Sequence, residues 1–246
     1  MKKVIGIVSE GPTDYMVLKE VIDHITGIEN EYRRLQPEPD MAGRFGNGWK
    51  GVWKWCESTS NILDQFFYKI TPQIDLLVIQ MDADVSRKEK EVHCLCKQSL
   101  CKWAGKVHPL TCKKVAESQC EVKMPCTEHI QNAEGFEEHL ETSIRKWLGD
   151  SQFREDVLVT IPCDSTDTWI IAAYREQENV EMIENPWENV IARKKEYHGI
   201  RVPGSKKRTS VYSRFLPQIC REWRVVTEQC YSARSFERKI KKAFEK

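Results

Sequence analysis

The chain of 246 residues lacks several signatures that would place it in a common protein class. It has no nucleotide-binding glycine loop, because the glycines around Gly46 and Gly48 lack the necessary strand-to-helix context. It has no Ser-His-Asp constellation, no internal repeat and no apolar run long enough to cross a membrane. The N-terminus leads into a short strand rather than a signal peptide. We therefore expect a cytoplasmic protein with no membrane partner.

The chain also has little net charge, only +1, which at first argues against a nucleic-acid partner. Its distribution changes that view. From residue 190 onward there are 16 Lys and Arg against 5 Asp and Glu, whereas the first 189 residues carry 22 against 32. Such a split is typical of a polyanion-binding half beside an acidic, metal-binding half. Basic side chains that simply solvate C-terminal helices are the alternative.

Cysteine is abundant, with ten residues, although a reducing cytoplasm disfavours disulfides. Six of the ten fall within 86–132, a segment with little apolar periodicity that we interpret as an insertion. Structural zinc needs four Cys or His ligands, usually as two close pairs, and the spacing here is compatible with that but loose. Zinc and buried or free thiols remain two explanations. The best candidate zinc ligands are Cys94, Cys96, Cys101 and Cys112.

Two apolar runs, 4–8 and 76–81, end in acidic motifs. A β-branched run without alternation predicts a strand buried on both faces, as in a parallel sheet. Ligands bind such sheets outside the carboxyl ends of the strands, so Glu10, Asp82 and Asp84 should converge on one edge. Crowded carboxylates repel each other unless a proton or cation lies between them, and Mg²⁺ prefers such oxygen ligands. The alternative role for these carboxylates is capping of the helices that follow.

The remaining pattern predicts an α/β fold. We expect a third strand over 157–161 and a loop over 36–51. We expect helices up to Gly27, over 52–69, over 134–148, from Thr166, over 186–199, and two more at the C-terminus. The inner face of the helix over 52–69 should carry Trp55, Ile62 and Phe66. The predicted organisation is a catalytic core of 1–85 and 133–185, the Cys/His-rich insertion 86–132, and a basic helical part 186–246.

Two acidic motifs and three later segments of the chain resemble a known family. The E-G-x-T-D turn that starts at Glu10 and the D-x-D of Asp82 and Asp84 resemble the TOPRIM domain of topoisomerases, bacterial primases and OLD-family nucleases. The segment 161–169 and the final Trp223-x-x-Val226 and 230–236 resemble elements of uncharacterised TOPRIM-like bacterial proteins, several of them neighbours in defence systems. The resemblance covers most of the chain outside 36–51 and the insertion, although each motif is short.

The resemblance implies a TOPRIM-like, Rossmann-like, mainly parallel sheet flanked by helices. It implies that Asp82 and Asp84 hold Mg²⁺ or Mn²⁺ and that Glu10 is a general acid/base or a metal ligand. The family commonly has Glu where this chain has Asp167, which is one methylene shorter. Asp167 is then either a further acidic ligand or a first-turn residue that interacts with its helix dipole.

Basic residues complete the candidate site. OLD-type nucleases use a lysine downstream of the acidic set, and Lys206 or Lys207 fits by order; a solvated basic loop is the alternative. In a hydrolytic site such a lysine neutralises charge that builds on the scissile phosphate. The remaining candidates, as contacts to the nucleic-acid backbone, are Arg193, Lys194, Lys195, Arg201 and Arg208.

Taken together, the sequence predicts a Mg²⁺-dependent nuclease. The resemblance adds anti-phage defence, and a partner ATPase or another defence-system protein, as expectations. A protein that keeps the fold without activity, and that senses or docks nucleic acid or a phage protein, is the main alternative. A nucleotidyl or phosphate transferase is a second alternative, although it would need a nucleotide pocket that the sequence does not show.

Overall fold

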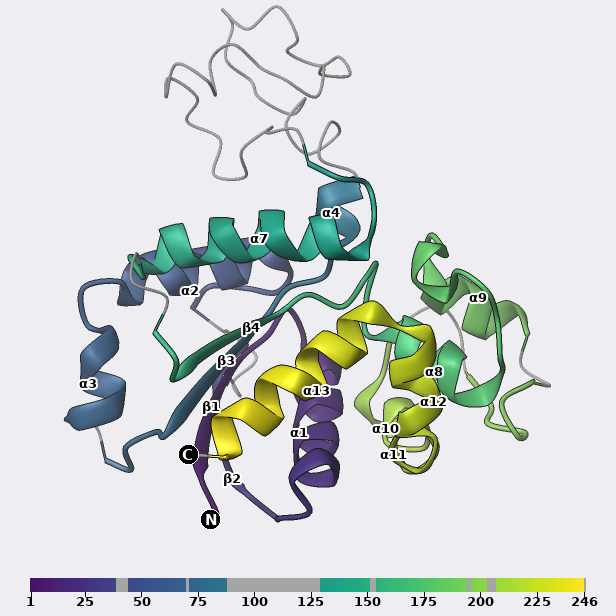
Figure 1. Cartoon of the computed structure of the whole chain (residues 1–246), viewed down its shortest axis with the longest axis horizontal. Helices are drawn as coiled ribbons and strands as arrows, with labels where there is room; N and C mark the ends of the chain where they lie inside the picture. Colours follow the sequence, from purple (N-terminus) through teal and green to yellow (C-terminus); the bar gives the residue numbers. More distant parts are fainter. Residues whose placement is uncertain are drawn as a thin grey trace, which may run out of the picture.

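A four-stranded parallel sheet forms the centre of the molecule in the computed structural model (Figure 1). The structure describes residues 1–38, 44–69, 71–87, 129–150, 154–193, 196–202 and 207–245. The strand order is β2-β1-β3-β4, and every neighbouring pair is parallel. The strands are β1 (Val4–Val8), β2 (Glu31–Gln36), β3 (Leu76–Gln80) and β4 (Val157–Thr160). This confirms the α/β prediction and brings the carboxyl ends of all four strands to one edge.

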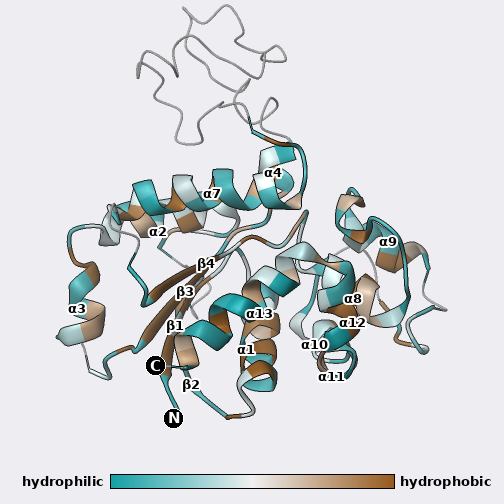
Figure 2. Ribbon diagram, viewed as in Figure 1, coloured by the Kyte–Doolittle hydropathy of each residue, from teal (hydrophilic) through white to brown (hydrophobic). Residues whose placement is uncertain are grey.

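The central strands are buried on both faces, which explains their apolar sequences. Ile5 and Ile7 of β1 pack into one hydrophobic cluster, whereas Leu77 and Ile79 of β3 pack into a second cluster on the opposite face. All five residues of β3 are buried. The apolar colouring of the strands and the mixed colouring of the surrounding helices show this layering (Figure 2).

The first face of the sheet is covered by helices from both ends of the chain. The long helices α1 and α13 lie on this side, and the shorter C-terminal helices gather beside them (Figure 1). The elements of this layer are α1 (Pro12–Thr26), α8 (Asp167–Tyr174), the 3-10 helix η1 (Val180–Met182), α9 (Pro186–Ala192), α10 (Thr209–Tyr212), α11 (Leu216–Arg221), α12 (Trp223–Gln229) and α13 (Tyr231–Phe244).

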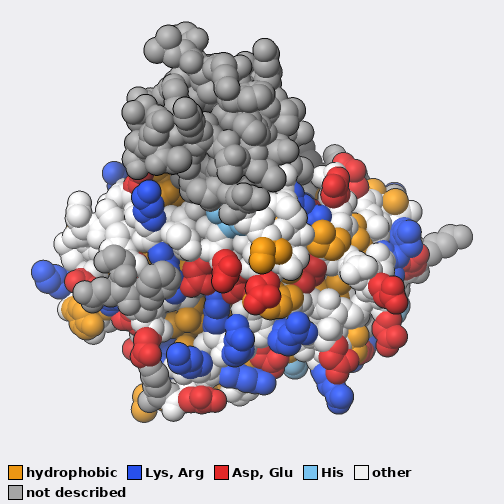
Figure 3. Space-filling model, turned by 45° about the horizontal axis from the view of Figure 1, so that its top comes forward, with side chains coloured by type: hydrophobic (Ala, Val, Ile, Leu, Met, Phe, Trp, Pro, Cys, Tyr) orange, Lys and Arg blue, Asp and Glu red, His pale blue; other side chains and the backbone are white. Residues whose placement is uncertain are grey.

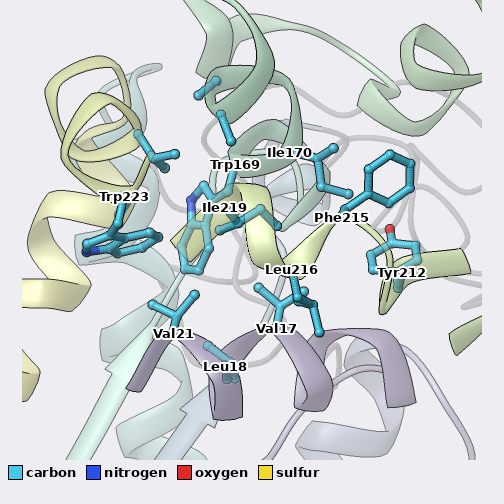
Figure 4. Packing of buried hydrophobic residues seen from close by; sticks show 14 of the residues in the cluster. Val17, Leu18, Val21, Trp169, Ile170, Tyr212, Phe215, Leu216, Ile219 and Trp223 are labelled. Carbon is cyan, nitrogen blue, oxygen red and sulfur yellow. The ribbon is translucent and has the colours of Figure 1, made fainter. Parts of the chain in front are cut away.

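The core of this first layer is centred on Trp169 of α8. Its ring lies 5.5 Å from Trp223 and 5.9 Å from Phe236, measured between ring centroids. Val21 of α1 packs into the same cluster, as the close-up shows (Figure 4). The C-terminal helices are therefore part of the same core as the N-terminal βα unit, and they bury apolar surface that neither part could cover alone.

The second face of the sheet is covered by helices from the middle of the chain. They are α2 (Trp49–Thr59), α3 (Leu63–Tyr68), the short α4 (Asp84–Arg87) and α7 (Ala133–Leu148). Gly6 of β1 faces this layer, and a Cβ there would stand 2.8 Å from Leu35 Cδ1. Glycine at this position therefore lets neighbouring side chains approach the strand closely.

Three helix predictions were wrong in their boundaries. The helix expected over 52–69 starts earlier, at Trp49, and breaks between α2 and α3, so Ile62 is 38% exposed rather than inward-facing. The helix expected over 186–199 ends at Ala192. The first of the two expected C-terminal helices is divided into several short helices. Apolar residues keep their helical spacing across each break, because the short helices on its two sides pack into the same buried cluster.

β2 was not predicted, and its composition explains why. Its residues Glu31–Gln36 are mostly half-buried, and four of the six are charged or amide side chains. It pairs only with β1, on one side, so it is an edge strand of the sheet. Edge strands are less buried than central ones and carry charged residues, which hides them from a search for apolar runs.

β4 forms the other edge of the sheet, and two cationic side chains bond to its backbone. Lys239 Nζ of α13 donates to the Val159 carbonyl at 2.8 Å, and Arg145 Nη2 of α7 donates to the Val157 carbonyl at 3.2 Å. Unpaired carbonyls on an edge strand can pair with a strand of another chain. Side chains of α7 and α13 occupy two of these carbonyls of β4 and so disfavour such pairing.

No helix in the described parts of the chain is both long enough and apolar enough to cross a membrane. The six cysteines of the insertion, including all four candidate zinc ligands Cys94, Cys96, Cys101 and Cys112, lie outside the described residues. The cysteines that the structure describes are Cys56, Cys163, Cys220 and Cys230, and none of these four forms a disulfide. The zinc hypothesis therefore remains a prediction.

Candidate functional site

Hydrogen bonds join the ends of β1 and β3 into one acidic corner. The two strands are parallel neighbours in which Val8 pairs with Ile79, so the residues after them lie side by side. Glu10 Oε1 accepts a hydrogen bond from the backbone N–H of Asp82 at 2.9 Å. Glu10 and Asp82 therefore lie at the same edge of the sheet, as parallel topology requires.

Gln80 holds this corner together from inside the sheet. Its side chain is fully buried at the last position of β3. Its Oε1 accepts from the Glu10 N–H at 3.0 Å, and its Nε2 donates to Asp82 Oδ1 at 2.7 Å. One amide thus fixes the backbone of Glu10 and the carboxylate of Asp82. Our sequence reasoning missed this residue, although an amide that ends an otherwise apolar strand was a usable signal.

Two more carboxylates, Asp14 of α1 and Asp167 at the start of α8, accept hydrogen bonds from the loop between β4 and α8. Thr166 Oγ1 donates to Asp14 Oδ1 at 2.7 Å, and Ser165 Oγ donates to Asp167 Oδ2 at 2.8 Å. Both carboxylates are buried, with 5% of Asp14 and 1% of Asp167 exposed. Asp14 was part of the E-G-x-T-D motif but was not among our candidate site residues. Ser165 and Thr166 were not candidates either, although both lie in the motif segment 161–169.

Lys207 brings a positive charge to this edge. Its Nζ lies 2.6 Å from Asp167 Oδ2, and its side chain remains 35% exposed. Burial alone would lower the pKa of Lys207, but the charges of Asp167, Asp82 and Asp14 raise it above the usual value of a lysine. The ammonium group therefore stays protonated and offsets part of the negative charge around it.

Despite the positive charge of Lys207, burial and the neighbouring carboxylates raise the pKa of three carboxyl groups at this edge. Burial, with smaller contributions from Asp84 and Asp14, raises the pKa of Glu10 to about 8. Burial also raises the pKa of Asp82 well above its usual value, and Asp14 and Glu10 add to that effect. The pKa of Asp14 is raised as well, again mainly by burial. Buried like charges of this kind are stabilised by bound protons or by a cation.

Asp84 completes the group that we call the carboxylate cluster. It begins α4, two residues after Asp82, and its side chain is half-buried. Its charge acts on the carboxyl groups of both Glu10 and Asp82. The cluster consists of Glu10, Asp14, Asp82, Asp84 and Asp167.

The donor chemistry of the cluster fits a hard divalent cation, but the described residues do not form a finished cage. The described ranges contain no group of three or more His, Cys, Asp or Glu side chains already arranged to hold a metal ion. Mg²⁺ usually takes only one or two protein carboxylates, and water and substrate phosphates complete its shell. In addition, Asp167 Oδ1 is buried and accepts no hydrogen bond from the described residues, which makes it a candidate cation ligand.

The other basic candidates lie in different environments. Arg193 is half exposed, and its guanidinium lies 3.6 Å from the carboxylate of Glu196, which is not part of the carboxylate cluster. Arg201 and Arg208 are exposed, Arg208 directly before α10. The remaining candidates, Lys194, Lys195 and Lys206, lie outside the described residues. Of the two lysines considered for catalysis, the structure thus describes Lys207.

Comparisons with protein-family models, curated proteins and solved structures gave no significant match to this chain. The resemblance to TOPRIM proteins therefore rests on the short motifs alone. The geometry of the carboxylate cluster is the basis for any functional argument, because a fold of this class hosts many unrelated activities.

Proposed function

We propose that this protein is a TOPRIM-type nuclease that hydrolyses phosphodiester bonds in nucleic acid with Mg²⁺ or Mn²⁺. The observation that carries the proposal is the placement of acidic residues after β1, β3 and β4 around the ammonium group of Lys207. Acidic residues that follow adjacent parallel strands suit a phosphate-bound divalent cation. A role in anti-phage defence with a partner protein extends the proposal and rests on the motif resemblance.

In this proposal Asp82 and Asp84 would hold the cation, Asp167 would be a further ligand, and Glu10 would be either a ligand or the general acid/base. The bound cation would supply Lewis-acid polarisation of the scissile phosphate. Gln80 orients Asp82 through its 2.7 Å hydrogen bond, so one ligand is positioned before any substrate arrives. Thr166 does the same for Asp14. Such positioning lowers the reorganisation that the reaction requires.

Glu10 and Lys207 are the candidates for the chemical step. The pKa of Glu10, raised to about 8 chiefly by burial, lets its carboxyl group hold and release a proton near neutral pH. Lys207 places a permanent positive charge beside Asp167, where the negative charge of a phosphate would increase in the transition state. Both roles require substrate phosphate at the edge of the sheet, next to β1 and β3.

The test is cleavage of labelled single- and double-stranded DNA and RNA with Mg²⁺ or Mn²⁺. We expect Asp82→Asn with Asp84→Asn to abolish cleavage. Lys207→Ala should reduce turnover at nearly unchanged affinity, because the lysine acts on the transition state. The matched control is Asp75→Asn: Asp75 also bonds β1, but at the opposite edge of the sheet, through the Val4 N–H at 2.7 Å. Equal activity in all variants would refute the proposal.

A non-catalytic binding protein is the second candidate, and two observations favour it. Lys207 already neutralises Asp167, and the described side chains form no ready metal cage. Titration with Mn²⁺ followed by calorimetry distinguishes the two candidates. Heat that disappears in the Asp82→Asn, Asp84→Asn variant supports the enzyme. No Mn²⁺ binding, together with tight binding of nucleic acid, supports the non-catalytic protein.

A further inference from the structure

Alternating tryptophans and lysines lie on the first two turns of α2, beside the carboxylate cluster. We call this surface the α2 aromatic strip; it consists of Trp49, Lys50, Trp53 and Lys54. The two tryptophans are partly buried, whereas both lysines are exposed. The tryptophan rings lie 6.3 Å apart between centroids, and the Lys50 ammonium lies 5.8 Å from the Trp49 ring centroid.

The strip begins where the backbone contacts Glu10. Gly48, the residue before α2, donates its N–H to the Glu10 carbonyl at 2.9 Å. A Cβ on Gly48 would stand 3.9 Å from Glu10 Oε2, so the turn lies directly against this carboxylate. Gly48 also has φ +76°, a conformation that favours glycine. A chain that contacts Trp49 is therefore close to the carboxylate cluster.

Core packing alone does not explain the composition of the strip. The inward face of α2 is formed by Val52, Trp55 and Cys56, of which Trp55 is 4% exposed. Trp49 and Trp53 lie at the margin of that face and pack against the same cluster while keeping part of their surface in solvent. Just before the helix, Arg44 lies 5.2 Å from the Phe45 ring centroid, which repeats the pairing of a cation with an aromatic ring.

We propose that the α2 aromatic strip binds single-stranded nucleic acid and delivers it to the carboxylate cluster. Bases stack on the exposed surface of Trp49 and Trp53, and Lys50 and Lys54 contact the phosphates between them. This inference names the substrate class of the proposed nuclease and rests on that function for the chemistry at Glu10. A duplex does not fit this role, because its bases stack on each other and offer no free face to a protein ring.

Charge around the strip agrees with a polyanionic partner. Lys50 and Lys54 are exposed on α2, and Arg44 is exposed just before the helix. Each cation that contacts a phosphate releases a counterion from the nucleic acid, so binding weakens as salt rises. Aromatic rings interleaved with cations are typical of single-strand binding, because stacking tolerates any base while the cations follow the backbone.

The experiment measures binding of fluorescently labelled oligothymidylate and oligouridylate by anisotropy in EDTA, where no cleavage occurs. A duplex of equal length is the comparison. We expect tighter binding of a single strand than of the duplex. Trp49→Leu and Trp53→Leu should each weaken that binding about tenfold, because base stacking on one ring is lost. Trp49→Phe and Trp53→Phe keep a ring and should lose less. Lys50→Ala with Lys54→Ala should lower the salt slope of single-strand binding by about 1.4 units, since each phosphate contact contributes about 0.7.

The matched controls lie at the opposite edge of the sheet. Tyr68 is an aromatic residue with 66% exposure at the end of α3, and Lys2 is an exposed lysine before β1. Tyr68→Ala and Lys2→Ala should bind like wild type. Circular dichroism shows whether each variant is folded. If a leucine variant is unfolded, Trp49→Phe and Trp53→Phe still test the role of the rings.

The outcomes separate this inference from the proposed nuclease. Strand binding that depends on the tryptophans, in a protein that never cleaves with Mg²⁺ or Mn²⁺, supports the strip and refutes the enzyme. Cleavage that is unaffected by the tryptophan changes supports the enzyme and refutes the strip. Equal or tighter binding of the duplex, or no binding of either single strand, also overturns the inference.

Discussion

Single residues in this protein show how burial changes the behaviour of polar groups. Gln80 is completely buried, yet both ends of its amide are hydrogen-bonded, to the Glu10 N–H and to Asp82 Oδ1. A buried amide without these partners would destabilise the fold, whereas a paired one orients its neighbours. The buried and half-buried carboxylates of the cluster have no such full compensation, and this difference leads to the first prediction.

We expect Asp82→Asn to stabilise the metal-free protein at pH 8 by about 0.5–2 kcal/mol. The folded-state pKa of Asp82 is raised well above its usual value, chiefly by burial. Stability from this group is therefore present below its unfolded pKa and is lost as pH rises through the folded pKa. Asparagine removes the charge and can still accept the bond from Gln80. Urea unfolding at pH 8 measures the effect, with Asp75→Asn as the control. A destabilised Asp82→Asn would contradict the electrostatic description.

His139 should make the fold sensitive to acid. It is buried, with 8% exposed, and its ring stacks on His129 with centroids 4.2 Å apart. Burial, with a smaller effect of His129, lowers the pKa of His139 to about 4. Because the folded pKa lies below the unfolded value, stability is present above pH 6.5 and is lost as pH falls toward 4.

The second prediction is that wild type loses about 2–3 kcal/mol more of its unfolding free energy than His139→Phe between pH 7 and pH 4. Phenylalanine keeps an aromatic ring at this position but cannot be protonated. Unfolding free energies at pH 7, 5.5 and 4 measure it. The control is His24→Gln, at an exposed histidine of α1, which should lose stability with falling pH as wild type does. If His139→Phe lost stability between pH 7 and 4 as steeply as wild type, the acid sensitivity would have another origin.

At the scale of elements, α13 connects the C-terminal part of the chain to α7 and to the edge of the sheet. Lys239 Nζ lies 2.5 Å from Glu137 and 2.7 Å from Glu141, both on α7. The same ammonium donates to the Val159 carbonyl of β4. Helical periodicity predicted α13 and α7 separately. Neither pattern indicated that one lysine would join both helices and β4, because such contacts depend on how the helices cross.

The third prediction concerns this lysine. Lys239→Met should destabilise the protein by about 2–4 kcal/mol, because Glu137 and Glu141 are left without their shared ammonium in a mostly buried place. Adding Glu137→Gln to that variant should recover part of the loss. Lys242→Met, on an exposed lysine of the same helix, should change stability by less than about 0.5 kcal/mol. Thermal and urea unfolding measure all three; an additive double variant would argue against a direct ion pair.

At the scale of the whole molecule, the uneven charge of the sequence is partly neutralised within the fold. Lys207 and Lys239 come from the basic C-terminal part and pair with acidic residues of the preceding part. Lys and Arg side chains nevertheless gather on one face, where exposed residues of α13 contribute (Figure 3). The charge split in the sequence therefore reflects both internal ion pairs and exposed basic side chains.

The fourth prediction applies to the whole molecule. Mg²⁺ or Mn²⁺ should raise the thermal unfolding midpoint of the wild type, because a cation bound only by the folded state stabilises it, by about 2.7 kcal/mol at 100 times Kd. The Asp82→Asn, Asp84→Asn variant should show no metal-dependent rise, and Asp75→Asn should respond like wild type. A rise of equal size in all three proteins would place the cation elsewhere. Differential scanning fluorimetry at constant ionic strength makes the comparison.

The sequence by itself determined the parallel α/β sheet and the placement of Glu10 and Asp82 at one edge. It could do so because an apolar run without alternation requires burial on both faces, and parallel strands end at the same edge. Only the tertiary structure decided that Thr166 bonds Asp14, 152 positions away, and that Lys207 pairs with Asp167. Such contacts depend on how the C-terminal helices pack against the first face of the sheet. No local sequence pattern specifies that packing. The helix break before α3 and the edge strand β2 were decided in the same way, by what each segment packs against.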